Sequence, residues 1–135
     1  DRVGPVAALA TLNKYQATKA DAHIINIGNK VKAIWKKYAH IHKLDINITG
    51  LPSLAAFDFA GENKQVFNTL FTIMMLEDGF LGFRQFKPSL AHKDEHLAEY
   101  EKAIDRIFKV LALDKTGSAL STPVHHARFE YLTKE

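Results

Sequence analysis

Residues 21–43 carry a helical pattern of apolar and polar positions. Apolar residues recur there at alternating steps of three and four, which is the spacing of one helical face, while most of the lysines fall on other faces. The apolar positions are Ile24, Ile27, Val31, Ile34, Tyr38 and Ile41. The pattern predicts a long amphipathic helix, in which Gly28 costs about 1 kcal/mol relative to alanine without having to end the helix.

Three further segments have helical patterns. Residues 4–12 are rich in helix-forming residues, and Pro5 is tolerated there because a first helical turn leaves its N–H groups unpaired. A second helix is predicted from Asn63 to a C-terminus near Gly79, since glycine readily adopts positive φ. A third begins near Lys93, where two following acids suit the positive end of the helix dipole. The apolar stripe of the helix from Asn63 consists of Val66, Leu70, Ile73 and Met74. The buried stripe predicted for the helix from Lys93 consists of Leu97, Tyr100, Ile104, Ile107, Phe108 and Leu111.

Two short strands are predicted between the long helix and the next one. Ile46 and Ile48 alternate with polar residues, and a turn containing glycine and proline follows them. A second apolar run covers residues 54–59, in which Phe57 and Phe59 flank an aspartate. Because side chains alternate along a strand, both rings are expected on one face of the sheet.

The remaining element, residues 80–90, alternates weakly and is predicted as a third strand region. Pro88 within it has no N–H to donate, which favours an edge strand or a bulge. The resulting order is two helices, two strands, a helix, a strand and a helix. This order of short strands and helices predicts an α+β fold, with a small antiparallel or mixed sheet of about three strands covered by helices.

The composition is that of one soluble domain. The chain has 135 residues, of which 47% are hydrophobic and 24% charged, enough to bury a sizeable core. It contains no cysteine, which excludes disulfide bonds and thiolate metal sites. No apolar run approaches the roughly 20 residues needed to cross a bilayer, so we expect no membrane partner.

The charge is small overall but unevenly distributed. A net charge of +3 does not indicate a nucleic acid partner. Residues 19–43 contain six lysines and one acid, whereas residues 94–105 contain five acids and one lysine. The segment Lys30–Lys37 is typical of a basic amphipathic helix that binds an anionic partner, and equally of a solvated lysine face over a buried stripe. A free-standing binding module that uses Lys30–Lys37 is therefore kept as the alternative function.

The segment from His92 to His96 matches the H-x-x-E-H pattern of one class of zinc protease. Two imidazoles one helical turn apart would bind zinc and Glu95 would activate water, but little chain remains to supply a third ligand. We interpret the segment as a helix start with two surface histidines, and expect no metal. The pairs His40 with His42 and His125 with His126 are no more indicative. Since no nucleophile elbow, phosphate-binding glycine loop or Ser/His/Asp arrangement is present either, the residues alone indicate no catalytic centre.

Four stretches, taken in order, resemble parts of one enzyme family. Residues 4–12 look like its alanine-rich helix, and residues 65–80 resemble a helix and turn of its small domain. Residues 89–97 are similar to its Ser-x-Ala-His-Thr-x-Glu-x-Ile signature, and residues 123–129 to a Pro-Val-x-His-x-Gly-Phe ending in related proteins. The family is that of the class III pyridoxal-phosphate (PLP) aminotransferases, and the nearest likeness is to the C-terminal part of the glutamate-1-semialdehyde aminomutases.

This resemblance implies a division of the chain and a function for the whole enzyme. Residues 1–20 would be the helix connecting to a large domain upstream, residues 21–113 the C-terminal small α+β domain, and residues 114–135 a tail. The complete enzyme would transfer an amino group of a small amino or keto substrate through pyridoxal 5'-phosphate. The Schiff-base lysine and the aspartate at the pyridine nitrogen would lie in the large domain, so we expect this chain alone to be inactive, with no catalytic or cofactor-binding residue.

The resemblance also implies a homodimer in the cytoplasm, held mainly by the large domains.

Two departures from the family pattern matter. Lys93 stands where the signature has a threonine, so the following helix must be capped by another group or less well. Arg84 stands where aminomutases carry a glutamate near the active site, which reverses the local charge and suggests a related aminotransferase of different specificity. Arg84, with Gln85 if the register slips by one, is the candidate for binding a substrate carboxylate; the alternative is that Arg84 points to solvent.

Overall fold

The computed structural model describes residues 2–114, 116–121 and 123–124. Its elements follow the predicted order, with one 3₁₀ turn added between the first two strands. They are α1 (Val3–Ala17), α2 (Ala20–His42), β1 (Ile46–Thr49), the 3₁₀ turn η1 (Pro52–Leu54), β2 (Ala55–Phe59), α3 (Lys64–Glu77), β3 (Gln85–Phe86) and α4 (Asp94–Leu113). Half of the predicted tail, residues 125–135, lies outside the described residues, as do residues 115 and 122.

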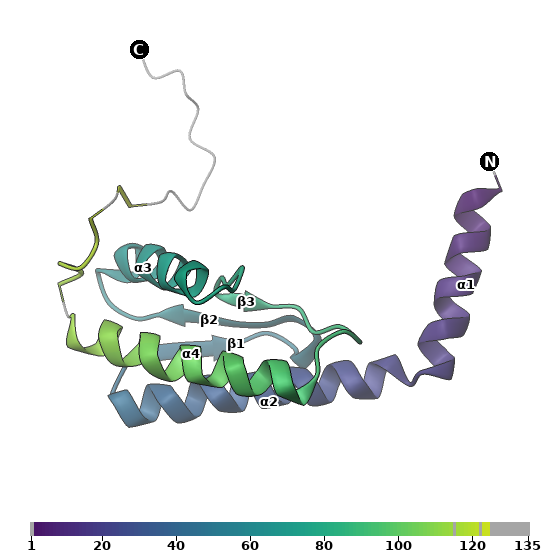
Figure 1. Ribbon diagram of the computed structural model, residues 1–135, viewed down its shortest axis with the longest axis horizontal. Coiled ribbons are helices and arrows are strands. Elements are labelled where there is room, and N and C mark those ends of the chain that lie inside the picture. Colours follow the sequence, from purple (N-terminus) through teal and green to yellow (C-terminus); the bar gives the residue numbers. More distant parts are fainter. Residues whose placement is uncertain (1, 115, 122, 125–135) are drawn as a thin grey trace, which may run out of the picture.

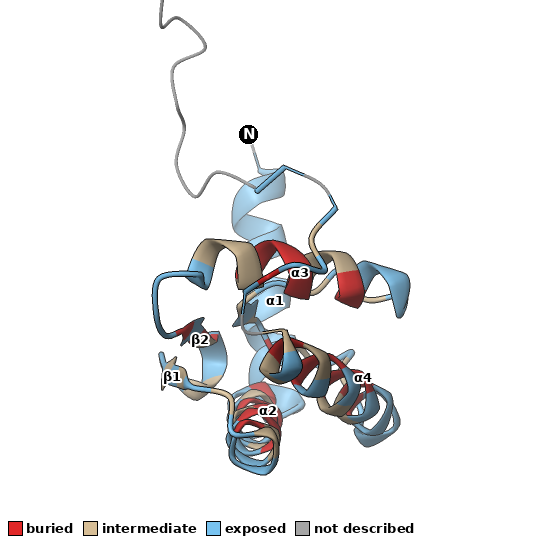
Figure 2. Cartoon of the chain, turned by 90° about the vertical axis from the view of Figure 1, so that its left-hand side faces the viewer, coloured by how far each residue is buried: buried red, intermediate tan, exposed pale blue. Residues whose placement is uncertain are grey.

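The three strands form one antiparallel sheet in the order β1–β2–β3. Ile46 of β1 lies opposite Phe59 of β2, and Ala56 of β2 lies opposite Gln85 of β3. Helices α2, α3 and α4 pack on one side of this sheet, as the two perpendicular views show (Figures 1 and 2). The predicted α+β fold is confirmed, and the sheet is antiparallel rather than mixed.

An aromatic cluster fills the space between the sheet and the helices. Phe57 of β2 lies at its centre, with ring centroids 4.9 Å from Trp35 of α2, 5.3 Å from Phe71 of α3 and 5.7 Å from Phe108 of α4. All four side chains are fully buried, and their edge-to-face geometry is the preferred one for aromatic pairs. Phe59 is buried beside Phe57, so the prediction that both rings share the core face is confirmed.

Gly28 sits where α2 crosses η1. A Cβ atom at this position would lie 1.8 Å from the carbonyl oxygen of Pro52. Since no side-chain carbon fits at that distance, the glycine lets the backbone of η1 approach the helix directly. From the sequence, Gly28 was expected only to weaken the helix. In the structure, the absence of a side chain at Gly28 is what allows α2 and η1 to cross this closely.

The third strand is much shorter than predicted. Of residues 80–90, only Gln85 and Phe86 form strand pairs with β2, and the carbonyl of Arg84 accepts one further hydrogen bond, of 3.0 Å, from the Phe57 N–H; residues 80–84 are otherwise irregular. Gly82 packs so closely on Met75 that a Cβ atom would lie 2.6 Å from its side chain. This segment therefore follows the surface of α3 instead of extending the sheet. Pro88 is buried two residues beyond the end of β3. The prediction of an edge strand is confirmed, because β3 is the outer strand of the sheet.

Helix α1 stands apart from the rest of the molecule. It leaves the start of α2 at an angle and extends away from the sheet and the other helices (Figure 1). The chain bends between them at Lys19, which adopts a left-handed conformation with φ of 49°. None of the α1 residues is buried. The helix predicted over residues 4–12 is confirmed, and it makes no contribution to this core.

Candidate functional site

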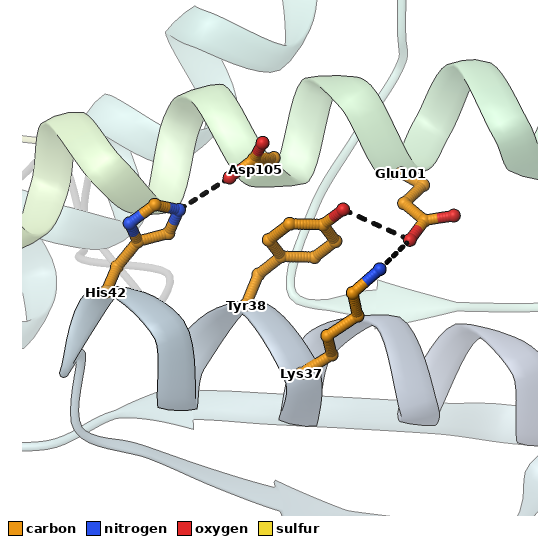
Figure 3. Close-up of polar contacts among 5 residues, drawn as sticks. All are labelled: Lys37, Tyr38, His42, Glu101 and Asp105. Carbon is orange, nitrogen blue, oxygen red and sulfur yellow. Dashed lines mark hydrogen bonds and ion pairs between the residues drawn. The ribbon is translucent and has the colours of Figure 1, made fainter.

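The lysine-rich face of α2 lies against the acidic face of α4. Lys37 Nζ is 2.8 Å from Glu101 Oε1, which also accepts a hydrogen bond of 3.1 Å from the Tyr38 hydroxyl (Figure 3). The hydrogen bond with Glu101 raises the pKa of Lys37. The same bond lowers the pKa of Glu101. Both residues are therefore charged at neutral pH and engaged with each other.

Two further pairs join α2 to α4, one on each side of the Lys37–Glu101 pair, and we call this row of contacts the α2–α4 seam. Lys30 Nζ is 2.6 Å from Oδ1 of Asp94, the first residue of α4. His42, the last residue of α2, has its Nε2 2.6 Å from Asp105 Oδ1 (Figure 3). Lys32 donates to the carbonyl of Gly50 at 2.8 Å. The lysines at 30, 32 and 37 thus bind groups of this chain, which argues against Lys30–Lys37 as a docking face for an anionic partner.

Arg84, the candidate carboxylate-binding residue, lies immediately before β3. One of its terminal nitrogens forms an ion pair with the Asp58 carboxylate of β2, and the guanidinium lies 5.0 Å from the centroid of the Phe83 ring. The side chain is 23% exposed, and its Nε is buried without a hydrogen-bond partner. Gln85, the alternative candidate, is exposed on the edge strand. Arg84 is thus held against the protein by an acid rather than extended into solvent.

Sequence reasoning did not identify Asp58 as the partner of Arg84. The signal available was its place between Phe57 and Phe59, which puts its side chain on the sheet face opposite the core. That alternation indicated exposure but not a partner, because the path of residues 80–84 along α3 cannot be deduced from a strand pattern.

The histidines of the H-x-x-E-H segment are used for backbone hydrogen bonds. Nδ1 of His92 accepts from the N–H of Ser89 at 3.0 Å, and Nδ1 of His96 accepts from the N–H of Lys93 at 3.2 Å. Across the described part of the chain, no group of three or more His, Cys, Asp or Glu side chains is arranged to hold a metal ion. The pair His125 and His126 lies outside that part.

At the start of α4, Lys93 stands where the signature that the chain resembles has a threonine, and a different residue caps the helix. Lys93 precedes α4 and offers no side-chain acceptor, and His96 accepts the Lys93 N–H instead.

Among the described residues, no helix has both the length and the apolar character to cross a bilayer.

The fold, but not the sequence, leads to a known protein. No protein-family model matches the chain, and no curated protein matches it significantly. The chain is similar to a solved structure described as the PLP internal aldimine form of the FumI protein of Sphingopyxis sp. MTA144, with a TM-score of 0.73 and 22% sequence identity. The match covers 88% of this chain and 28% of that one. The chain thus has the fold of one segment, less than a third, of a longer protein.

Proposed function

We propose that this chain is the C-terminal small-domain segment of a PLP-dependent enzyme, an aminotransferase or aminomutase. The observation that carries the proposal is the similarity in fold to a segment of a PLP-bearing protein, at a TM-score of 0.73 over 88% of the chain. The order of the family-like stretches at residues 4–12, 65–80 and 89–97 supports the same assignment independently of the fold.

Helix α1 supports the existence of a further domain. Its large apolar side chains are mostly exposed, with 74% of Val3, 64% of Val6, 62% of Leu9 and 59% of Leu12 accessible. They follow one another at steps of three residues, and much of the remaining surface is alanine. A helix that is apolar around most of its circumference is normally buried on several sides. In the proposed enzyme, the large domain covers α1.

The described residues do not fit a PLP-anchoring site. PLP acts as an electron sink once it is held by a lysine as an imine, and such a lysine has to be enclosed and activated. Every described lysine is exposed or only partly buried, and the partly buried Lys30 and Lys32 already donate to Asp94 and to the carbonyl of Gly50. No reaction step is therefore assigned to this chain, and we propose that the anchoring lysine belongs to the large domain.

The proposed contribution of this chain to the site is Arg84. Its guanidinium can offer two parallel N–H donors to a carboxylate, and the side chain is 23% exposed beside its ion pair with Asp58. We propose that a substrate carboxylate binds Arg84, with the next residue, Gln85 of the edge strand β3, as the alternative polar group. The substrate would be an amino or keto compound bearing a carboxylate, and the enzyme a cytoplasmic homodimer.

Borohydride trapping in the protein isolated from its source tests the assignment. Reduction should attach PLP irreversibly to one lysine, and peptide mass spectrometry should locate it outside residues 1–135. The 135-residue chain alone, treated in the same way, should show no stoichiometric modification at any one lysine. A trapped cofactor on a lysine of this chain, or a source protein without trapped PLP, would overturn the proposal.

A further inference from the structure

The segment between β3 and α4 is fastened by two histidine side chains. In the turn at residues 89–92, the N–H of His92 donates to the carbonyl of Ser89 at 3.1 Å, and the N–H of Ser89 donates back to Nδ1 of His92 at 3.0 Å. One step along the chain, the N–H of Lys93 donates to Nδ1 of His96 at 3.2 Å. The turn and the first turn of α4 are thus both closed by an imidazole nitrogen acting as acceptor.

These bonds define the protonation state of both rings. A backbone N–H can only donate, so the Nδ1 atom that it meets must carry a free lone pair. In this arrangement Nδ1 of each ring is the acceptor, and Nε2 is the nitrogen left to carry the hydrogen of a neutral ring. Histidines commonly change charge between pH 5 and 8. Protonation adds a hydrogen to Nδ1 opposite the backbone N–H, and a hydrogen bond becomes a contact between two donors.

We propose that His92 and His96 form an acid-sensitive latch on residues 87–96. The neutral rings hold the turn and the start of α4 in place, and protonation releases both backbone contacts.

The charged groups around His96 partly oppose one another. Glu95 Oε1 lies 4.0 Å from His96 Nε2, and Lys93 Nζ lies 3.9 Å from the same carboxylate oxygen and offsets part of its charge. The neighbouring Asp94 is engaged by Lys30 of α2 at 2.6 Å. His96 is 51% exposed, so protons from solvent reach it directly.

The surroundings of His92 allow its protonation without releasing the ring. Ser89 Oγ lies 3.0 Å from Nδ1 and can accept from the protonated ring, which leaves the Ser89 N–H as the group that loses its partner. From α2, His23 Nε2 contacts the carbonyl of His92 at 2.9 Å and must donate to it, a role that the charged ring also fills. From β3, the Phe86 ring lies 4.9 Å away and carries no charge.

Opening of the latch is a local event. Beyond the first turn, α4 remains anchored by Leu97 and Tyr100, both buried in the core. At the far end of the same helix pair, His42 Nε2 lies 2.6 Å from Asp105 Oδ1, a contact that a charged imidazole also makes. Acid is therefore expected to loosen residues 87–96 while the α2–α4 packing persists.

Hydrogen–deuterium exchange of the protein as purified tests this proposal. Exchange of a peptide covering residues 87–97 is compared at pH 5 and pH 8, each corrected for the intrinsic pH dependence of amide exchange. We expect the protection of this peptide to be about tenfold lower at pH 5, the effect of losing an ordinary hydrogen bond at the upper end of its range. Peptides from the core of α2 and from β2 should keep their protection.

The matched control replaces both histidines by asparagine. In His92→Asn/His96→Asn, the side-chain oxygen occupies the place of Nδ1, accepts the same N–H and does not titrate. This variant should keep high protection at both pH values, whereas His92→Ala/His96→Ala should show low protection at both. His40→Asn, at an exposed histidine of α2, should retain the wild-type response. Equal protection of the wild type at both pH values, or a loss at pH 5 that persists in the asparagine variant, would overturn the latch.

Discussion

At the scale of single residues, a hydrogen bond between Trp35 and Tyr100 lies inside the core. Trp35 Nε1 donates to the Tyr100 hydroxyl at 2.9 Å, and this bond joins α2 to α4 among apolar side chains. Burial raises the pKa of Tyr100, so the hydroxyl stays neutral. The bond satisfies an indole N–H that would otherwise be buried without a partner, a cost of about 1–3 kcal/mol. It therefore helps to select one alignment of the two helices.

Arg84 is the residue at which the proposed substrate class can be tested. In the complete enzyme, Arg84→Ala should raise KM for a carboxylate-bearing substrate by about tenfold to a hundredfold, since a charged hydrogen bond of roughly 1.5–3 kcal/mol is lost. Steady-state kinetics measures the change, and Gln85→Ala shows whether the neighbouring residue has this role instead. Unchanged KM in a folded Arg84→Ala enzyme would leave Arg84 with only its ion pair to Asp58.

At the scale of elements, close backbone approaches decide how the helices sit on the sheet. The crossing of α2 over η1 depends on the absence of a side chain at Gly28, and the path of residues 80–84 along α3 depends on Gly82. At the far end of α3, Arg106 donates to the carbonyl of Met74 and pairs with Asp78, which fixes the helix end against α4. These contacts join neighbouring elements pairwise around the aromatic cluster.

Gly28→Ala separates helix propensity from tertiary packing. Propensity alone predicts a gain of about 1 kcal/mol, but the new Cβ would meet the Pro52 carbonyl at 1.8 Å. We expect the clash to dominate and to lower the free energy of unfolding by about 1–3 kcal/mol in urea titrations. Gly4→Ala on α1 is the matched control, because nothing lies within 4 Å of its Cβ position. A stabilised Gly28→Ala variant would contradict the crossing as described.

The α2–α4 seam predicts a pH dependence on the acid side. The hydrogen bond from Lys37 lowers the pKa of Glu101 in the folded protein. Its contribution to stability is thus complete above its unfolded pKa of about 4.3, and is lost as the pH falls through the lower folded value. In urea titrations from pH 6 downward, Glu101→Gln should lose less stability on acidification than the wild type. Glu99→Gln, at an exposed position on α4, should behave as the wild type; equal acid sensitivity in both variants would refute the role of Glu101.

At the scale of the whole molecule, the structure divides into a packed body and an uncovered helix. The body contains all three strands and the helices α2, α3 and α4, whereas α1 has no buried residue. The fold similarity covers less than a third of the neighbouring protein, which leaves ample chain there to cover such a helix. The large domain proposed above would account for an exposed apolar helix of this kind, since large exposed apolar patches commonly mark contact sites.

Charges on α1 should therefore matter only in the complete protein. Val6→Lys/Leu9→Lys should leave the urea midpoint of the 135-residue chain nearly unchanged, because both side chains are already exposed. In the complete protein, the same change should lower the thermal midpoint and promote aggregation, since two charges would be buried without partners. Lys14→Gln, at an exposed polar position of the same helix, is the control and should leave the thermal midpoint of the complete protein nearly unchanged. A large loss of stability in the short chain would show that α1 packs on its own body.

The sequence by itself determined the order of the helices and strands and most of their buried faces. These follow from backbone geometry, because a period of 3.6 or 2 in apolar residues is a local property of the chain. The stripe of α4 and the shared face of Phe57 and Phe59 were predictable in this way. The α2 stripe was predicted only in part, because Ile41 is 52% exposed and Trp35, which the pattern did not include, is fully buried. Local patterns also showed a basic stretch at residues 19–43 and an acidic one at residues 94–105.

Only the tertiary structure decided what those stretches do. The packing of α2 beside α4 brings Lys37 to Glu101 and Lys30 to Asp94, and so turns an apparent anion-binding face into an internal seam. It likewise gave Arg84 the partner Asp58 and shortened the predicted third strand to Gln85 and Phe86. Each of these outcomes depends on contacts between residues distant in the chain, whose positions follow from how the layers pack rather than from any period along the sequence.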